Sequence, residues 1–413
     1  MDYLYRTDTI MIKKSDPLFQ IIDNLSFLAK NIYNSALYIE RQSIIKNGKV
    51  INYSNLNSLH KQLYPQDYTS LPIQTTQQIL MLAARNCHSF SKATNEYFFN
   101  PSKFYSKPKL PKYKHKTTGR HIIPFTNQQV KYRDGYLYFP TKSNIPPIKT
   151  RLDLSQEHLD LQQIRIVPCS NSYKIEIIYT KGINLPPKQN IISGLDLGLD
   201  NFATISIYNY NTNPLIINGK GLKSYNKFFN KQLASLKSQA MKRNNLHTTK
   251  KIQSLHRNRL NYFKDFYHKA SKHIVNYLVE NKVGYIVIGK NKNWKQNSPL
   301  SKEVNQTFIQ IGHSQFIDIL TYKLLEQNIS VYISEESYTS GTSYLDKEEP
   351  TKENYNKSRR IHRGLFRSNQ GYLINADVNA AFQIIKKVKE FKVTNYPPPL
   401  IPYILQPKKI NIA

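Results

Sequence analysis

The sequence has few of the residues on which disulfide scaffolds, zinc ribbons and membrane proteins depend. Cys87 and Cys169 are its only cysteines, too few for a disulfide framework or a cysteine zinc ribbon. There is no run of 18 apolar residues and no signal peptide, so we expect no membrane partner and no export. Both cysteines are expected to be reduced apolar side chains of an intracellular protein.

Acidic residues are also scarce. The chain has 27 Asp and Glu against 59 Lys and Arg, which gives a formal net charge of +32 at pH 7. A protein this basic repels itself unless it binds a polyanion, and nucleic acid is the polyanion that we favour. Tyrosine is abundant, with 30 residues, and part of this aromatic surface is expected to make contacts.

The 413 residues predict two or three domains. Residues 3–13 alternate as in a strand, and residues 15–100 show helical periodicity in three segments, the first ended by Asn47-Gly48. Two hairpins are predicted around Asp134-Gly135 and Ser170-Asn171-Ser172. These patterns predict a wedge-like β-barrel built from residues 1–14 and 101–187 and interrupted by a helical insert over 15–100.

A basic, proline-containing segment follows the helical insert. Residues 101–121 hold seven Lys or Arg and three prolines, which excludes a helix and burial. A solvated loop is one interpretation, and a nucleic-acid contact is the one that the net charge favours. Stacking partners would be Phe104, Tyr105 and Tyr113. The cations proposed for phosphate contact are Lys107, Lys109, Lys112, Lys114, Lys116 and Arg120.

The second half of the chain predicts a mixed sheet with helices. Asp196 lies near the end of a strand in the hairpin 191–207, and a third strand follows at 214–217. Three such strands followed by alternating helices and strands indicate an RNase H-like sheet. The remaining elements are helices over 225–279, 303–325 and 373–386, strands over 285–288 and 329–333, and an extended tail over 393–413 that need not be ordered.

Two further groups of cations lie in this half. The bend of the helical pair 225–279, near Asn244-Asn245, is basic and has no acid nearby, so we propose phosphate contacts there. A polar segment, 339–372, carries the second group. The residues of the two groups that we expect to bind nucleic acid are Lys242, Arg243, Arg257, Arg363 and Arg367.

Two acids stand where an RNase H-like site would hold metal ions. Asp196 lies on the first strand, and Asp377 lies in the first turn of the last helix. Each acid also has an ordinary explanation, as a turn former and as a favourable charge at a helix start. The third acid should be a glutamate near Gly289, which has no side chain to offer.

Several stretches resemble the transposon-encoded TnpB nucleases, whose RuvC core is shared with Fanzor proteins and compact type V CRISPR effectors. These stretches follow one another in the order of that family and extend to about residue 390. They are LAKNIYNSALYIERQ, LPIQTTQQIL, GLDLGLDNFAT, YIVIGKNKNWKQ, EESYTSGTSYLD and RGLFRSNQGYLINADVNAAFQI.

The resemblance implies an α+β multidomain protein whose RuvC domain spans 188–338 and 373–392, with a nucleic-acid-binding insertion at 339–372. It implies RNA-guided cleavage of DNA beside a short adjacent motif, with a guide RNA from the transposon end. Two Mg²⁺ would be held by Asp196, Asp377 and, as in one branch of the family, Glu336 after the next strand. Because the fifth strand lies beside the fourth, Glu336 can reach the metals, while Glu335 points to the other face.

The insertion lacks the cysteines that the family often has there, because Gly341 and Thr342 stand where the first is expected. We therefore expect no zinc, with Arg363 and Arg367 positioning the nucleic acid instead. The expected partners are a guide RNA, double-stranded target DNA and its displaced strand. The protein would be a monomer or homodimer in the cytoplasm, associated with the nucleoid when bound to DNA.

Two alternatives remain open at this point. A nuclease-dead, RNA-guided DNA-binding repressor would also carry this sequence pattern, and Gly289 is the residue that favours it. A transposase acting by strand transfer on the same fold is the other alternative, although no separate sequence-specific DNA-binding module is evident.

Overall fold

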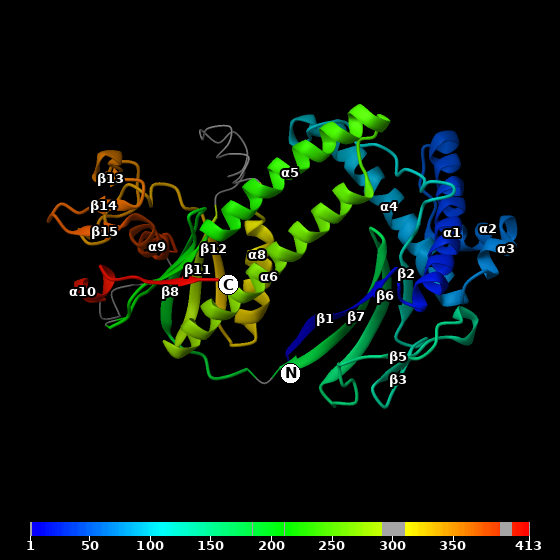
Figure 1. Ribbon diagram of the computed structural model, residues 1–413, viewed down its shortest axis with the longest axis horizontal. Coiled ribbons are helices and arrows are strands. Elements are labelled where there is room, and N and C mark those ends of the chain that lie inside the picture. Colours follow the sequence, from blue (N-terminus) through cyan, green and yellow to red (C-terminus); the bar gives the residue numbers. More distant parts are fainter. Residues whose placement is uncertain (1, 184, 210, 291–309, 389–398, 413) are drawn as a thin grey trace. The chain divides into compact units, whose positions relative to one another are not determined.

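The computed structural model describes residues 2–183, 185–209, 211–290, 310–388 and 399–412. The chain is a mixed α+β protein that divides into two compact units, Met1–Asn184 and Leu185–Ala413 (Figure 1). The division falls at the segment that contains Pro186 and Pro187. Within the described ranges, no helix has both the length and the apolar character needed to cross a membrane.

The first unit contains the predicted helical segments between its first and second strands. Helix α1 ends where Asn47-Gly48 predicts, because Gly48 adopts a φ of 66° and its N–H bonds to the carbonyl of Ile44. The helices are α1 (Leu18–Asn47), α2 (Tyr53–Leu63), α3 (Pro65–Thr69) and α4 (Ile73–Phe99), with short 3-10 turns η1 (Pro101–Lys103) and η2 (Thr141–Ser143).

The strands of the first unit form two sheets in place of the predicted single barrel. One sheet has the order β1-β7-β6-β2, the other β3-β4-β5. The strands are β1 (Asp2–Lys13), β2 (Ile123–Thr126), β3 (Lys131–Arg133), β4 (Tyr136–Tyr138), β5 (Ile148–Lys149), β6 (Leu159–Cys169) and β7 (Ser172–Ile183). Both predicted hairpins are confirmed, by the pairs β3–β4 and β6–β7.

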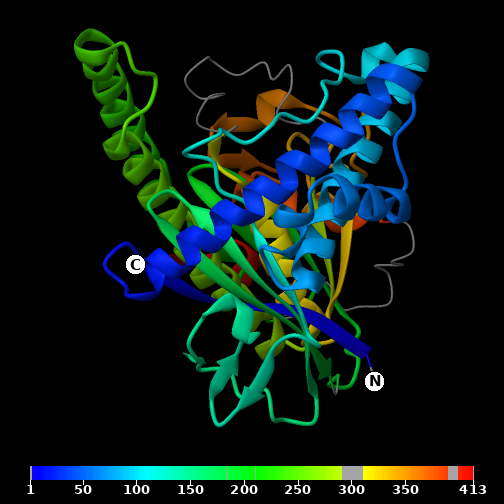
Figure 2. The ribbon, with the colours of Figure 1, turned by 90° about the vertical axis from the view of Figure 1, so that its right-hand side faces the viewer.

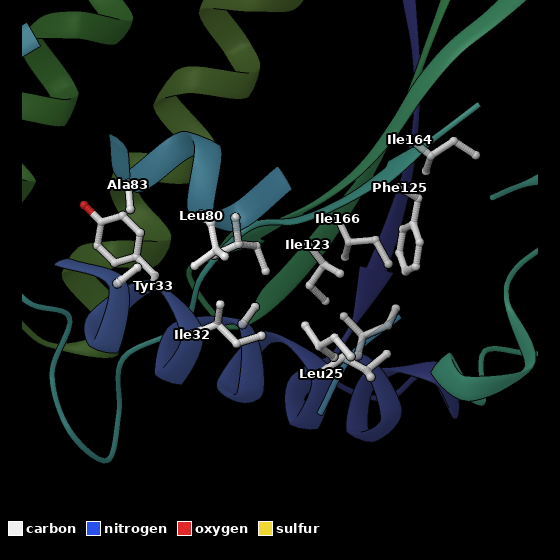
Figure 3. Close-up of a cluster of buried hydrophobic side chains, with 14 of the residues drawn as sticks. Leu25, Ile32, Tyr33, Leu80, Ala83, Ile123, Phe125, Ile164 and Ile166 are labelled. Carbon is white, nitrogen blue, oxygen red and sulfur yellow. The ribbon is translucent and has the colours of Figure 1, made fainter. Parts of the chain in front are cut away.

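The helices explain why the four-stranded sheet need not close. Leu25 and Ile32 of α1 and Leu80 of α4 lie against Phe125 of β2 and Ile166 of β6 (Figure 3). All five side chains are buried. The sheet therefore buries its apolar face against helices, as in a two-layer domain, and not against a second curved part of itself.

The second unit is built on a six-stranded mixed sheet. Its order is β12-β11-β8-β9-β10-β16, with β8, β9 and β10 antiparallel and β8, β11 and β12 parallel. The predicted adjacency of the fourth and fifth strands is confirmed by the β11–β12 pair. The strands are β8 (Ile191–Leu197), β9 (Asn201–Ile207), β10 (Leu215–Asn218), β11 (Val283–Gly289), β12 (Ser330–Ser334) and β16 (Lys408–Asn411).

Helices cover both faces of this sheet (Figure 1). Leu195 and Ile286 pack in the core shared with α6 and α8, whereas Ile192 and Val287 pack in the core shared with α9. This alternation follows from the two-residue period of a strand. The helices are α5 (Lys220–Asn244), α6 (Lys250–Glu280), α8 (His313–Leu325), α9 (Ala376–Lys386) and α10 (Ile401–Ile404).

Helices α5 and α6 form the predicted helical pair, and their joined ends lie away from the sheet (Figure 2). Helix α5 ends beside Asn245, whose φ is 49°. Within the predicted helix 303–325, the structure has α8 at His313–Leu325, and residues 303–309 lie outside the described residues.

Two predictions near the C-terminus are wrong. Residues 373–375 form strand β15 (Leu373–Asn375), not helix, because they pair with β14 (Leu365–Arg367), which also pairs with β13 (Arg360–His362). The described part of the tail, 399–412, is ordered as α10 and β16, because β16 finds an open sheet edge at β10. Residues 393–398 lie outside the described residues.

Candidate active site

Three predicted acids, Asp196, Glu336 and Asp377, line one cavity of about 500 Å³ in the second unit. The cavity lies where β8, β11 and β12 end and α9 begins. Its other lining residues are Ser337, Tyr338, Thr339, Ser340, Tyr355, Arg360 and Ala380. Residues from distant parts of the sequence therefore share one site.

Asp196 faces α9 because of its place on β8. Ile192 packs with α9, and the strand period of two puts Asp196 on the same face. Between them, Gly194 allows the helix to approach closely, because a Cβ at Gly194 would lie 1.9 Å from the carbonyl oxygen of Ala381. The close approach of α9 to β8 brings Asp377 and Asp196 into one cavity.

Asp377 is held at the start of α9 by hydrogen bonds. The side chain of Asn375 accepts hydrogen bonds from the backbone N–H groups of Asp377 and Val378, which caps the helix. Asn201 Nδ2 donates to Asp377 Oδ2 at 2.8 Å, and Arg360 Nη2 lies 3.8 Å from Asp377 Oδ1. The carboxylate thus has a set orientation.

Gly289, at the end of β11, leaves room for Glu336. A Cβ at Gly289 would lie 2.9 Å from Glu336 Oε2 and 2.6 Å from Ile384 Cδ1. The carboxylate of Glu336 therefore lies against the position where the sequence analysis expects the third acid. Glu335 is exposed, accepts a hydrogen bond from the Ser337 hydroxyl and does not line the cavity.

Burial disfavours the charged forms of Asp196 and Glu336. Burial raises the pKa of Asp196 well above its usual value, the nearby Asp377 and Glu336 raise it further, and Arg360 opposes them. Burial raises the pKa of Glu336 to about 7. A cation in this cavity would relieve both effects.

The donor set fits a hard divalent cation in its chemistry, because Mg²⁺ prefers carboxylate oxygens. In the parts of the chain that the structure describes, however, no three such side chains are gathered closely enough to hold a metal ion. The Arg360 guanidinium, near Asp377, supplies part of the positive charge that the acids require.

The insertion 339–372 separates its arginines into two kinds. Arg359 pairs with Glu348 at 2.7 Å, and Arg360 lines the cavity. Arg363 and Arg367, proposed for nucleic acid, are both exposed, and Arg363 Nη1 lies 3.8 Å from Asp200 Oδ2. Of the four arginines between residues 359 and 367, Arg359 and Arg360 therefore have partners inside the unit, and Arg363 and Arg367 are exposed.

The predicted phosphate-binding residues of the first unit differ in exposure. Lys107, Lys109, Lys112, Lys114 and Lys116 are all exposed. Arg120 differs from these lysines, because its guanidinium donates two hydrogen bonds to the Asp23 carboxylate, at 2.6 and 2.9 Å, and these donors are not open to a phosphate. This ion pair raises the pKa of Arg120 and lowers that of Asp23.

The predicted cations of the helical pair also differ. Lys242 and Arg243 are exposed in the last turn of α5. Arg257 is half-buried on α6, and its Nη2 donates to the Ser254 hydroxyl at 3.5 Å.

Sequence reasoning missed Asn201 and the cavity position of Arg360. Arg360 belongs to a visible arginine cluster, but its direction depends on the β13–β14 pairing. Asn201 follows Asp196 by five residues, and nothing in its sequence context indicates a contact with Asp377.

Two segments of the chain match known protein families. Residues 172–295 match the OrfB_IS605 family model, described as a probable transposase, and residues 313–384 match the Cas12f1-like TNB domain. The resemblance to the TnpB family is confirmed. The first matched segment contains Asp196, and the second contains Glu336 and Asp377. No curated protein matches the chain.

Several solved structures are similar to this chain. A Cas12f1–sgRNA–target DNA complex has 18% identity and a TM-score of 0.37, over 94% of this chain and 100% of that chain. A CRISPR–Cas12f ternary complex has 14% identity and a TM-score of 0.39, over 90% and 82%. C2c1 of Alicyclobacillus acidoterrestris with single-guide RNA has 9% identity and a TM-score of 0.33, over 91% and 68%.

Proposed function

We propose that this chain is an RNA-guided DNA endonuclease encoded by a transposon. It would use a guide RNA from the transposon end and cleave target DNA beside a short adjacent motif. The observation that carries the proposal is the single cavity lined by Asp196, Glu336 and Asp377. The strand order, with three antiparallel strands followed by two parallel ones, supports an RNase H-like nuclease domain over 188–338 and 373–392.

The steric relation between Gly289 and Glu336 supports Glu336 as the third acid. An acidic side chain at position 289 would begin 2.9 Å from Glu336 Oε2, so the carboxylate of Glu336 would have to leave its present position to admit it. This relation also weakens the case for an inactive protein, because the loss of an acid at position 289 is matched by an acid in the space it would fill.

RuvC-like nucleases use divalent metal ions, and Asp196, Glu336 and Asp377 would hold two Mg²⁺ here. When bound, the ions would supply positive charge that activates water and stabilises the leaving 3′ oxygen. Asn201 would keep the Asp377 carboxylate oriented through its 2.8 Å hydrogen bond. Guide pairing would select the target sequence, while exposed lysines of the protein contact the phosphates.

The test is guide-dependent cutting. The protein is co-expressed with the DNA that flanks its gene, so that a native guide RNA is captured, and the purified complex is given matched target DNA with Mg²⁺ or EDTA. Asp196→Asn and Glu336→Gln should each reduce cutting by at least about 100-fold while RNA binding is kept. Glu335→Gln is the matched control, because Glu335 is adjacent but does not line the cavity.

Two results would overturn parts of the proposal. Equal cutting by Glu336→Gln and the unsubstituted protein would remove Glu336 from the site. Guide-dependent binding of the target with no cutting under any divalent metal would favour the nuclease-dead, DNA-binding protein.

A further inference from the structure

We propose that an aromatic and basic surface at the end of α4 binds an unpaired nucleic-acid strand, whose bases stack on Phe98, Phe99 and Tyr105. We call these three residues the aromatic ledge. The inference rests on the proposed function for the class of partner, and it assigns that partner to a surface separate from the nuclease cavity.

The ledge exposes large rings to solvent. Phe98 is 81% exposed, Phe99 76% and Tyr105 92%. The rings of Phe98 and Phe99 meet edge to face, with centroids 5.4 Å apart. Neighbouring exposed hydrophobic side chains indicate a contact surface, because water solvates them poorly.

The segment after α4 folds back on the last turns of the helix. The ring of Phe104 packs against that of Tyr97, with centroids 5.7 Å apart, and Lys103 Nζ lies 2.6 Å from Glu96 Oε1. These contacts hold Phe104 and Lys103 against the end of α4, and the next residue, Tyr105, is exposed. Phe104, predicted as a stacking residue, is instead a packing residue of this fold.

The chain then continues along α1 as residues 112–121, which we call the lysine track. Three α1 side chains, spaced four residues apart on one helix face, bond the track's backbone. Ser26 Oγ donates to the His121 carbonyl, Lys30 Nζ to that of Lys116 and Asn34 Nδ2 to that of Lys114, at 2.6, 2.7 and 2.9 Å.

These bonds tie down the backbone of the track and leave its lysine side chains exposed. Lys112, Lys114 and Lys116 stand at alternate positions and are all exposed. Tyr113, between them, is 43% exposed, and the Arg41 guanidinium lies 4.9 Å from its ring centroid. The track thus presents a row of charged side chains on a backbone that is already fixed.

The positive charge around the ledge and the track favours a negatively charged partner. Residues 97–133 contain nine Lys or Arg and no Asp or Glu, and Glu96 is paired with Lys103. A second copy of the chain would bring the same positive charge, whereas a phosphate backbone is complementary to it. A duplex has its base faces stacked inside, so only an unpaired strand offers flat rings to the ledge together with phosphates to the track.

The test is binding of single-stranded oligonucleotides, RNA or DNA, that carry 2-aminopurine. Full-length protein with Asp196→Asn, which keeps the oligonucleotide intact, is compared with and without Phe98→Ala/Phe99→Ala and with Tyr105→Ala. Each change should weaken single-strand binding at least about fivefold and reduce the fluorescence change of the stacked base. Binding of a duplex of the same sequence should be unchanged.

Two controls separate stacking from charge. Tyr5→Ala removes an aromatic side chain that is 74% exposed on β1, and it should leave the affinity unchanged. Lys112→Ala and Lys114→Ala should each reduce the slope of log affinity against log salt by about 0.7, whereas the ledge variants should keep the slope.

Unchanged single-strand affinity in the ledge variants would overturn the inference. So would a ledge variant that changes only the sedimentation of the protein, because the surface would then join two copies of the chain. Neither assay needs metal or cutting, so a failure of the nuclease proposal would be seen separately, in the cleavage of matched target DNA.

Discussion

At the residue scale, Gly289 and Glu336 depend on each other. The first has no side chain, and the second places a carboxylate oxygen 2.9 Å from the point where that side chain would begin. The sequence shows only that an expected acid is missing from one position and that a glutamate lies 47 positions later. Their steric relation turns the two observations into one explanation of the site.

Gly289→Ala should therefore damage the site although it adds only a methyl group. The new Cβ would lie 2.6 Å from Ile384 Cδ1 and 2.9 Å from Glu336 Oε2, so both side chains have to move. We expect a loss of about 1–3 kcal/mol in the free energy of unfolding, as in other overpacked cores, and at least about tenfold slower cutting. Thermal unfolding and cleavage rates measure the two effects.

Gly364→Ala is the matched control, because no atom lies within 4 Å of the position of its Cβ. It should leave stability and cutting nearly unchanged. Normal cutting by Gly289→Ala would show that Glu336 does not need its present position.

A second residue-scale prediction concerns pH. Glu40 of α1 is fully buried, its Oε2 accepts a hydrogen bond from the Ile51 N–H at 3.1 Å, and burial raises its pKa to about 7. The folded state therefore holds a proton that the unfolded state releases near its ordinary pKa of 4.5. The raised pKa of Glu40 therefore costs no stability below pH 4.5, and the free energy of unfolding falls as the pH rises from 4.5 to about 7.

Glu40→Gln removes the charge and keeps an oxygen to accept the Ile51 hydrogen bond. The variant should be more stable than the original protein above pH 7, by on the order of 1–3 kcal/mol, and the difference should vanish toward pH 4.5. Melting temperatures between pH 4.5 and 8 measure it. Glu157→Gln, at an exposed position of the same unit, is the control. A pH-independent difference would contradict the burial of a titrating Glu40.

At the element scale, the insertion 339–372 is fastened to α9 by polar contacts centred on Glu348. Its carboxylate accepts hydrogen bonds from Arg359 Nη1 at 2.7 and 2.8 Å and from the Ser343 N–H at 2.8 Å. Its backbone carbonyl accepts from Gln383 Nε2 and Lys386 Nζ of α9, both at 3.0 Å. This network connects the insertion to the helix that carries Asp377.

Glu348→Gln should loosen that connection. It would leave the Arg359 guanidinium, which is only 17% exposed, with Asp346 at 4.0 Å as its remaining acidic neighbour among the described residues. We expect a loss of about 1–3 kcal/mol in the free energy of unfolding and faster amide hydrogen exchange over residues 343–348. Glu353→Gln is the control, because Glu353 is an exposed acid of the same insertion. Unchanged exchange would mean that the Glu348 carboxylate does not order this part of the insertion.

At the scale of the whole molecule, the positive charge is concentrated rather than spread evenly. Residues 97–133 in the first unit and residues 201–264 in the second contain no Asp or Glu. The second stretch includes α5, most of the first half of α6, and twelve Lys or Arg. Each unit therefore has its own basic, acid-free region, and together these two regions carry 21 of the 32 net positive charges.

The sequence by itself predicts the class of partner and determined most of the elements. Charge, periodicity and turn residues are local or additive properties, so they predicted nucleic acid, the end of α1 at Gly48 and both hairpins. The adjacency of β11 and β12 was predicted from the RNase H-like fold that the family resemblance implied. The family motifs placed Asp196, Glu336 and Asp377 in one hypothesis before any geometry was known.

Only the tertiary structure decided what each side chain faces. Leu373–Asn375 form a strand and residues 408–411 form β16, because each segment pairs with the edge of another strand. The first unit has two sheets in place of the predicted barrel, because helices cover the apolar face of the larger sheet. Arg120 and Phe104 were predicted to bind nucleic acid, but their side chains contact Asp23 and Tyr97 inside the protein. Pairing and packing join residues far apart in sequence, and local patterns carry no information about such partners.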